Sequence, residues 1–314
     1  MLDLTLRQLR AVAAVHRNGR IVSAAKALGL SQPAVTLQIR DAESAAGTKL
    51  FDRTSQGLRP TAAGRAVVEA ALAVEERLEA MRDELEAIRG GRRGGLRLGV
   101  VSTAKYFAPR VMAAFLESNP GIDMTLWVGN RAETIDTLAT HAVDIALMGR
   151  PPRGIPIRAA LFGDHPLVVV APPGHPLAGQ RAIPVRRIAE EKFLVREVGS
   201  GTRISLEMLF STIPGRVDHI GVEMGSNETI KQAVIAGLGI ALISAHTIEQ
   251  EVETGRLVVL DVEGLPIVRQ WFAVSRSDRE VSPTMLLFED FLRREAGRFL
   301  PEVPGVSRLI AAAE

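Results

Sequence analysis

The chain has 314 residues, of which 46% are hydrophobic and 24% are charged, a balance typical of a globular protein with room for two or three domains. It contains no cysteine, which excludes disulfides and thiolate metal sites and fits a reducing, cytoplasmic location. We expect no signal peptide, because Asp3, Arg7 and Arg10 interrupt the first apolar stretch. We expect no membrane partner, because the longest apolar run, 233–245, falls short of the ~20 residues that a span needs.

The charge of the chain is distributed unevenly. Residues 1–64 hold nine Lys or Arg and four Asp or Glu, a net charge of +5. The remainder holds 29 basic and 32 acidic residues, a net charge of −3, so that the whole chain is +2. An excess of positive charge in one segment favours contact with a polyanion such as DNA.

The first 47 residues predict three helices. One runs from Thr5 to Asn18 and stops at Gly19. The second carries the apolar residues Ala24, Ala25 and Leu28, begins at a cap on Ser23 and ends at Gly29. The third begins at a cap on Ser31, with Pro33 in the first turn, where its missing N–H costs nothing.

The third helix has two distinct faces. Val35, Ile39, Ala42 and Ala46 recur at spacings of four, three and four and form an inward face. The opposite face is short and polar and consists of Pro33, Thr36 and Arg40, with Gln32 on its flank. Two short helices followed by such a polar face are typical of a helix-turn-helix with its recognition helix. An ordinary helical hairpin is the alternative.

A small β-wing and a long helix come next. Leu50–Phe51 and Leu58–Pro60 flank a turn at 54–57, with Arg53 and Arg59 at the edges of the wing. The helix, about 61–89, carries a heptad seam typical of a coiled-coil dimer contact. The seam consists of Val67, Ala71, Val74, Leu78, Met81, Leu85 and Ile88. A helix packed on its own domain is the alternative.

Beyond a basic linker at Gly90–Gly95, strands and helices alternate. Strands are expected near 96–101, 123–128, 144–148, 166–170, 193–196, 217–223, 240–243 and 257–260, with helices between them. This order predicts an α/β domain with mostly parallel strands and helices on both faces. Pro151–Pro152 and Pro172–Pro173 suggest two lobes, joined by crossover strands near 163–168 and 266–273. A last helix, about 283–299, would return to the first lobe.

Three polar segments follow strands or open helices in this half. They are Ser102–Thr103, Gly199–Ser200–Gly201–Thr202–Arg203 and Asn227–Glu228–Thr229. In open α/β sheets ligands bind beyond the strand ends, where helix N-termini present N–H groups to anions. Lys105, Arg131 and Arg150 add positive charge, so the pattern predicts a small-anion site, although the second and third segments also read as helix caps.

Other chemistries find no support in the sequence. The segment at 199–203 lacks the Lys-Ser/Thr of a phosphate-binding loop, and Ala236–Ala241 is not a dinucleotide fingerprint. None of the six histidines pairs with another at helical spacing, so we expect no metal and no bound cofactor beyond a small-molecule effector. No nucleophile arrangement is recognisable, and an enzyme with a fused DNA-binding domain is the remote alternative.

The segment 24–53 carries a highly specific family signature. Ala24–Ala25, Leu28, Ser31–Thr36, Ile39, Glu43, Gly47 and Leu50–Arg53 resemble the LysR-type transcriptional regulators, and the resemblance extends over essentially the whole chain. It implies a winged helix-turn-helix at 1–60, a linker and dimerisation helix at 61–90 and an effector-binding domain at 91–314. That domain is similar to type 2 periplasmic binding proteins, with one lobe at about 95–163 and 270–300 and the other at about 164–269. The chain departs from the family at three positions. The family frequently has a serine in place of Arg20 and leucines in place of Ala42 and Ala46.

The resemblance also implies contacts with double-stranded DNA. Gln32, Pro33 and Thr36 would lie nearest the base edges, and Ser31, Thr36 and Arg40 would reach phosphates. Arg53 would enter or border the minor groove, unless it forms a salt bridge with Asp52 or Glu43. Ser23 completes the expected DNA-binding set.

Segments 101–115, 149–152, 196–203, 226–247 and 264–272 resemble the Calvin-cycle subgroup (CbbR-type), which activates the RuBisCO operon. The resemblance implies a cytoplasmic homotetramer built from dimers, with RNA polymerase as a candidate partner. It implies an effector such as a sugar phosphate, phosphoenolpyruvate, NADPH or ATP. A regulator of another operon with a different small anion is the alternative.

Overall fold

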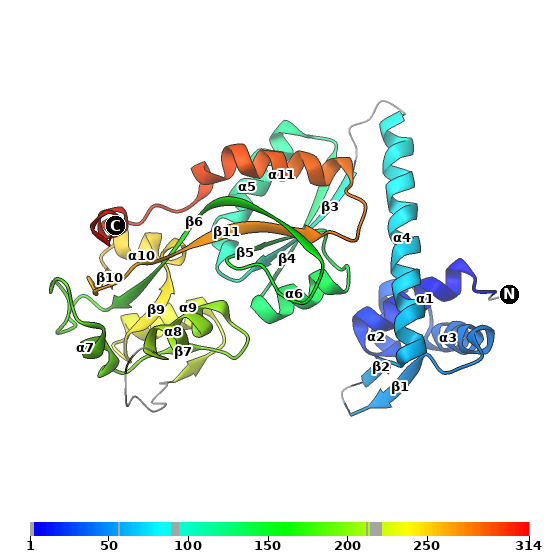
Figure 1. The fold of residues 1–314 in the computed structure, drawn as a ribbon, viewed down its shortest axis with the longest axis horizontal. Coiled ribbons are helices and arrows are strands. Elements are labelled where there is room, and N and C mark those ends of the chain that lie inside the picture. The colour runs from blue at the N-terminus through cyan, green and yellow to red at the C-terminus, as the bar shows by residue number, and fades with distance from the viewer. Residues whose placement is uncertain (1–2, 56, 89–93, 212, 214–221, 314) are drawn as a thin grey trace. The chain divides into compact units, whose positions relative to one another are not determined.

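A computed structural model describes residues 3–55, 57–88, 94–211, 213 and 222–313. The chain divides into two compact units, one formed by residues 1–94 and the other mainly by residues 95–139 and 143–314. Figure 1 shows both, and each is described by itself. The expected linker residues 90–93 lie outside the described residues, whereas Gly94 and Gly95 already belong to a strand rather than to a linker.

The first unit contains three helices, a two-stranded wing and a long helix. These are α1 (Leu6–Asn18), α2 (Ile21–Leu28), α3 (Gln32–Ala46), β1 (Phe51–Thr54), β2 (Gly57–Pro60) and α4 (Ala62–Ile88). The wing strands are antiparallel, and Phe51 lies opposite Pro60. The sequence-based bounds of all six elements are confirmed to within a few residues.

Local capping explains where the three short helices begin and end. Thr5 caps α1 in a capping box with Gln8, and Ser31 accepts a hydrogen bond from the backbone N–H of Ala34 at the start of α3. Glycines at 19, 29 and 47 end the helices in the left-handed conformation, at φ of 66°, 64° and 67°. The expected cap on Ser23 is wrong: α2 begins at Ile21, and Ser23 is its third residue.

The core of this unit joins α1, α3 and α4. Val12, Val35, Leu50 and Ala71 are fully buried in it. Gly64 lies against the backbone of Leu50, because a Cβ at this position would come within 1.9 Å of the Leu50 carbonyl oxygen. The close approach fixes the start of α4 against the loop that precedes the wing.

The second unit contains one sheet, a short strand pair and the helices around them. Its strands are β3 (Gly94–Val101), β4 (Ile122–Gly129), β5 (Ile145–Met148), β6 (Ile157–Ala171), β7 (Val195–Arg196), β8 (Glu223–Met224), β9 (Ala241–Ser244), β10 (Val258–Val259) and β11 (Ile267–Arg276). Its α-helices are α5 (Ala108–Ser118), α6 (Arg131–Ala139), α7 (Val185–Ala189), α8 (Gly201–Ser211), α9 (Asn227–Ile235), α10 (Glu249–Glu253), α11 (Pro283–Glu295) and α12 (Val306–Ala313). Three 3₁₀ turns lie at Ala104–Tyr106, Ala245–Thr247 and Ala296–Phe299.

The sheet is mixed, and the expectation of mostly parallel strands is wrong. Its order is β10-β6-β11-β5-β3-β4, with β9 also beside β6. β3 and β5 are parallel, whereas β11 runs antiparallel to β5 and β6, and β6 runs antiparallel to β9 and β10. The cause is the two long crossover strands, β6 and β11, which the sequence predicted only in part and which pair with each other over ten residues of β11.

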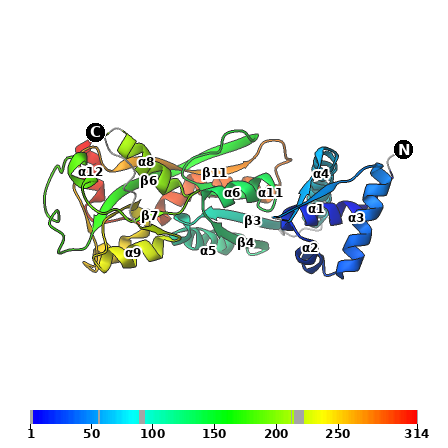
Figure 2. The same ribbon diagram turned by 90° about the horizontal axis from the view of Figure 1, so that it is seen from below.

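The crossover strands run through two lobes (Figure 2), and the buried apolar residues form one hydrophobic cluster in the first lobe and two in the second. The first cluster combines residues of 96–162 and 271–296, with α5 and α6 on opposite faces of the sheet and α11 beside α5 (Figure 1). The second lobe holds the clusters of 167–265. Its cover includes Val303 and the first residue of the unpredicted helix α12, Val306. Residues 217–221 of one expected strand lie outside the described residues.

Candidate DNA interface and ligand pocket

The polar face of α3 is exposed as the sequence predicted. Gln32, Pro33, Thr36 and Arg40 are exposed, and Val35 and Ile39 on the opposite side are buried. The hydroxyl of Thr36 donates to the carbonyl of Gln32 at 2.9 Å, and Ser31 caps the helix beside them. The exposed N-terminal turn of α3 thus combines side-chain donors with a partial positive charge, which suits contact with phosphates and base edges.

The wing adds a second basic position. Arg53 is exposed on β1, and in the described part of the chain it forms no ion pair. The alternative of a salt bridge with Asp52 or Glu43 does not hold for the described residues, and the Glu43 carboxylate instead accepts the backbone N–H of Leu50 at 2.9 Å. Ser23 is half-buried in α2, away from the helix start at which it was expected.

The face of α4 that carries the heptad seam emerges from the core toward its C-terminal half. Ala71 is buried and Val67 half-buried, whereas Val74 is 36%, Met81 47% and Leu85 50% exposed in this single chain. Leu78 is half-buried, and the side chain of Ile88 lies outside the described residues. An exposed apolar stripe of this length is typical of an unpartnered coiled-coil face.

A cavity of about 220 Å³ opens between the two lobes of the second unit. The first lobe contributes Ser102 and Thr103 at the end of β3, Arg131 at the start of α6 and the loop of Gly149, Arg150, Pro151 and Arg153 after β5. The second lobe contributes Arg196 and the first turns of α8, and the crossover strands contribute His165, Leu167 and Arg269. The remaining lining residues are Val101, Ser200, Gly201, Thr202, Ile204 and Ser205.

Positive charge dominates this cavity. Its described lining residues include five arginines and no acidic residue. Burial lowers the pKa of Arg131, and the charges of Arg150 and Arg269 lower it further. Burial and the charge of Arg150 likewise lower the pKa of Arg269. Because guanidinium groups stay protonated in proteins, these shifts mean that the cations are held close together with too little compensating negative charge.

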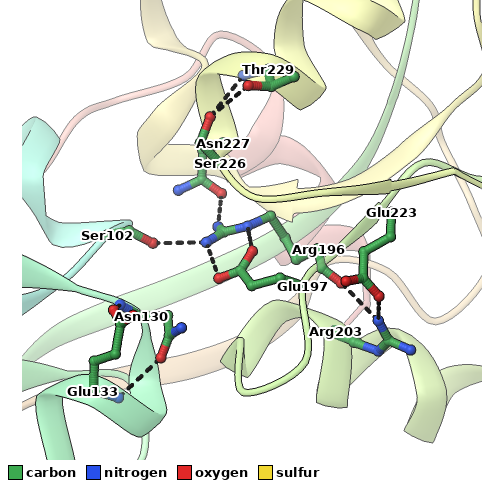
Figure 3. A network of polar contacts seen from close by, with 10 residues as sticks. All are labelled: Ser102, Asn130, Glu133, Arg196, Glu197, Arg203, Glu223, Ser226, Asn227 and Thr229. Atoms are coloured by element: carbon green, nitrogen blue, oxygen red, sulfur yellow. Dashed lines mark hydrogen bonds and ion pairs between the residues drawn. The ribbon is translucent and has the colours of Figure 1, made fainter.

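Arg196 is the most firmly held of the five (Figure 3). It is buried, its Nε donates to the Glu197 carboxylate at 2.7 Å, and its Nη1 donates to the Asn227 side chain. Its Nη2 also donates to the Ser102 hydroxyl at 3.2 Å, which ties the second lobe to the first. The position directly before the glycine-rich segment would have pointed to Arg196 in the sequence, whereas only the fold brings Arg153, Arg269 and His165 to the cavity.

Seven of the predicted effector residues line the cavity, and six do not. The seven are Ser102, Thr103, Arg131, Arg150, Ser200, Gly201 and Thr202. Among the six, Arg203 turns away to Glu223 (Figure 3) and to Glu207. Lys105 pairs with Glu228 at 3.4 Å. Asn227, Glu228 and Thr229 form the first turn of α9, which Ser226 caps.

Gly199, the sixth of these residues, permits close contact between the lobes. Its φ is +93°, and a Cβ there would come within 3.1 Å of the Ala132 Cβ. Its carbonyl accepts the backbone N–H of Ala132 at 3.3 Å. A side chain at this position would therefore strain the backbone and press the lobes apart.

Two other features bear on function. Among the described residues, no group of three or more His, Asp or Glu could hold a metal ion. Within the same part of the chain, no helix combines the length and the apolar character that crossing a membrane requires.

Comparison with known proteins places both units. Residues 6–65 match the family of bacterial regulatory helix-turn-helix proteins of the lysR type, and residues 89–297 match the LysR substrate binding domain. The chain is 59% identical over 303 residues to an HTH-type transcriptional regulator, CbbR, of Rhizobium meliloti, covering 96% of this chain and 97% of that one. It is 47% identical to a RuBisCO operon transcriptional regulator of Allochromatium vinosum, covering 95% and 98%.

Two solved structures are similar in fold. Full-length OxyR of Pseudomonas aeruginosa aligns with a TM-score of 0.73 at 20% identity, covering 95% of this chain and 97% of that one. The CcmR regulatory domain of Synechocystis, solved in complex with 2-PG, aligns with a TM-score of 0.60 at 36% identity, covering 64% of this chain and 96% of that one. With a winged helix-turn-helix, a long helix and a two-lobed α/β domain in one chain, the protein belongs to the LysR family of DNA-binding transcriptional regulators.

Proposed function

We propose that this chain is a regulator of a RuBisCO operon that responds to a small phosphate-bearing anion held between the two lobes. Relatives with 59% and 47% identity over nearly their whole length carry names of this kind, which supports the operon assignment. In this proposal residues 1–60 bind operator DNA, residues 61–90 form the dimer contact and residues 91–314 bind the effector. Pairs of dimers form the tetramer, and RNA polymerase is a partner at the promoter.

The observation that carries the effector proposal is the charge of the inter-lobe cavity. Arg131, Arg150 and Arg269 repel one another, and an anion would relieve that repulsion while accepting their N–H groups. The hydroxyls of Ser102 and Thr202 and the start of α8 supply neutral donors around the same space. Phosphate and carboxylate oxygens match this set of donors.

The size of the cavity ranks the candidate effectors. About 220 Å³ lies below the roughly 300–1,000 Å³ of typical drug-sized ligand pockets. A compact anion such as phosphoenolpyruvate or a small sugar phosphate is therefore favoured over ATP or NADPH. Because the similar CcmR domain was solved in complex with 2-PG, that compound is the natural first addition to these candidates.

The effector acts on DNA binding through the lobes. A ligand that contacts Ser102 from the first lobe and Thr202 from the second binds one lobe arrangement better than another. That difference in affinity shifts the equilibrium between arrangements, and the dimer transmits the shift to the spacing of two recognition helices.

Isothermal titration calorimetry on the full-length protein tests the effector proposal. The panel is phosphoenolpyruvate, 2-PG, a sugar bisphosphate, ATP, NADPH and a non-phosphorylated dicarboxylate. We expect a compact phosphorylated compound to bind, and Arg269→Gln to weaken its binding at least about tenfold, the loss typical of a charged hydrogen bond. Arg181→Gln, an exposed arginine outside the cavity, is the control and should bind as wild type.

Binding of the dicarboxylate alone would assign the chain to another operon and another anion. Footprinting tests the operon directly: protection should lie upstream of a RuBisCO operon, and its pattern should change with the compound that binds. A footprinting pattern that stays the same with every compound in the panel would contradict a metabolite-dependent switch.

A further inference from the structure

A histidine lies among the arginines of the inter-lobe cavity. His165, on β6, lines the cavity and is only 6% exposed. Arg269, on β11, is its partner in the strand register and lines the cavity beside it. The two crossover strands therefore place one cationic and one imidazole side chain at the junction of the lobes.

The two ring nitrogens of His165 differ in their surroundings. Nε2 lies 2.9 Å from the hydroxyl of Ser244, which is itself buried. Nδ1 is buried and has no hydrogen-bond partner among the described residues. An unpaired buried nitrogen is costly, so its presence in the wall of a ligand cavity calls for an explanation.

The imidazole is neutral and rigidly held. Burial lowers the pKa of His165 well below its ordinary value, and His246 and Arg269 lower it further. The ring stacks on Trp271 with centroids 3.9 Å apart, and the Trp271 Nε1–H donates to Nδ1 of His246 at 3.0 Å. A neutral ring carries one N–H, and Ser244 can serve Nε2 either as donor or as acceptor.

We propose that His165 is an effector-binding residue of this cavity, whose Nδ1–H donates to an oxygen of the bound anion while the Ser244 hydroxyl donates to Nε2. The proposal rests on the function proposed above and adds a neutral, directional donor to its arginines. Such a donor selects ligands that place an oxygen at one defined position, whereas a cluster of cations selects mainly for negative charge.

The contact requires a small movement, and the structure provides for it. Nδ1 lies against Gly149, where a Cβ would come within 2.6 Å of it. The neighbouring Arg150 carbonyl accepts a hydrogen bond from Arg131. An anion that recruits Arg131 would release this carbonyl, so that the Gly149–Arg150 segment can shift and let the ligand reach Nδ1.

Two substitutions separate the two ring nitrogens. In His165→Asn the side-chain amide occupies the place of Nδ1 and can still donate there, whereas in His165→Gln it occupies the place of Nε2 and keeps only the Ser244 contact. Titration of full-length protein with phosphoenolpyruvate and 2-PG should give at least about tenfold weaker binding for His165→Gln and a change within about threefold for His165→Asn. His246→Asn, in the same stack but outside this cavity, is the matched control and should bind as wild type.

Nitrogen-15 NMR of histidine in the bound wild-type protein reads the tautomer directly. A protonated Nδ1 on His165, coupled to the phosphate or carboxylate of the ligand, supports the proposal. An unprotonated Nδ1, or equal binding by His165→Gln and wild type, would overturn it even where Arg269→Gln binds at least about tenfold more weakly. Failure of wild type to bind either compound would instead remove the proposed function and this inference with it.

Discussion

We expect two exposed residues of the first unit, Gln32 and Arg53, to contribute to DNA recognition in different ways. Gln32 lies at the first turn of α3, from which an amide can pair with an adenine edge. Arg53 lies on the wing and has no ion-pair partner within the described residues, so that its charge is available to phosphates or to the minor groove.

Gln32→Ala should reduce discrimination between the operator and mutated half-sites, by about 1–3 kcal/mol at the base pair that it contacts. Arg53→Ala should instead weaken binding to every duplex and lower the slope of log K against log salt by about one. Fluorescence anisotropy across a series of salt concentrations measures both. An unchanged slope for Arg53→Ala would argue against a phosphate or groove contact.

His246 links stability to pH. Burial, with the charge of Arg110, lowers its pKa to about 4, and its Nδ1 accepts the Trp271 N–H. The unfolded chain binds this proton more tightly, so stability is full above about pH 6.5 and falls as the pH drops toward 4, by up to about 3 kcal/mol.

His246→Asn keeps an acceptor for Trp271 but removes the titration. Urea unfolding of the effector-binding unit between pH 4 and 7 should therefore show a shallower loss of stability for this variant than for wild type. Parallel profiles would show that His246 does not contribute to the pH dependence.

At the scale of elements, α4 has two roles along its length. Its first turns belong to the core of the first unit, with Gly64 against Leu50 and Ala71 buried. Its later turns present Met81 and Leu85 with about half of each side chain exposed. An exposed apolar stripe is costly in water, so we expect it to pair with the same stripe of a second copy.

Met81→Asp should therefore shift the protein from dimer or tetramer toward monomer, because a charge in the seam would lose hydration on pairing. Ala73→Asp places the same charge on an exposed position of α4 outside the seam and should leave assembly unchanged. Analytical ultracentrifugation over a range of concentrations distinguishes them. If both variants assemble as wild type, the dimer contact lies elsewhere.

At the scale of the whole molecule, the effector-binding unit couples its two lobes through few contacts. Arg196 donates a hydrogen bond to Ser102 across the cavity. Glu228 accepts a hydrogen bond from the Tyr106 hydroxyl and forms an ion pair with Lys105. The strands β6 and β11 run through both lobes. Trp271 is buried on β11, and its ring stacks with centroids 3.9 Å from His165 and 6.2 Å from His246, which makes it a reporter of changes in the inter-lobe cavity.

Trp127→Phe leaves Trp271 as the single tryptophan of the chain. Its emission should change on addition of the compound that binds, with a midpoint equal to the calorimetric Kd, because the ligand would contact the His165 ring that stacks on Trp271. In Arg269→Gln the midpoint should lie at an at least about tenfold higher concentration. Binding without any change in emission would indicate that the ligand does not contact the stacked ring.

Much of the first unit could be predicted because its determinants are local. Caps at Thr5 and Ser31, left-handed glycines and the alternation of Val35 and Ile39 with polar residues each act within a few residues. The one wrong cap, at Ser23, shows the limit: α2 begins two residues earlier without a side-chain cap, because its apolar face is fixed by packing on α1 and α3.

The effector site was predictable only in part, for a related reason. Ser102, Thr103 and Ser200–Thr202 lie at strand ends and helix starts, where ligands gather in any α/β fold, and they line the cavity. Arg203 and Thr229 lie in equivalent local settings but serve an ion pair and a capping turn. Local sequence does not determine which way a side chain points.

The sequence by itself determined the family, the helix-turn-helix and the exposed seam of α4, because helix periodicity, capping and family motifs are properties of short segments. Only the tertiary structure decided the mixed direction of the sheet and brought His165 and Arg269 together from strands about a hundred residues apart. Strand pairing and side-chain direction depend on which surfaces meet in the folded core, and that is set by the packing of distant segments against one another.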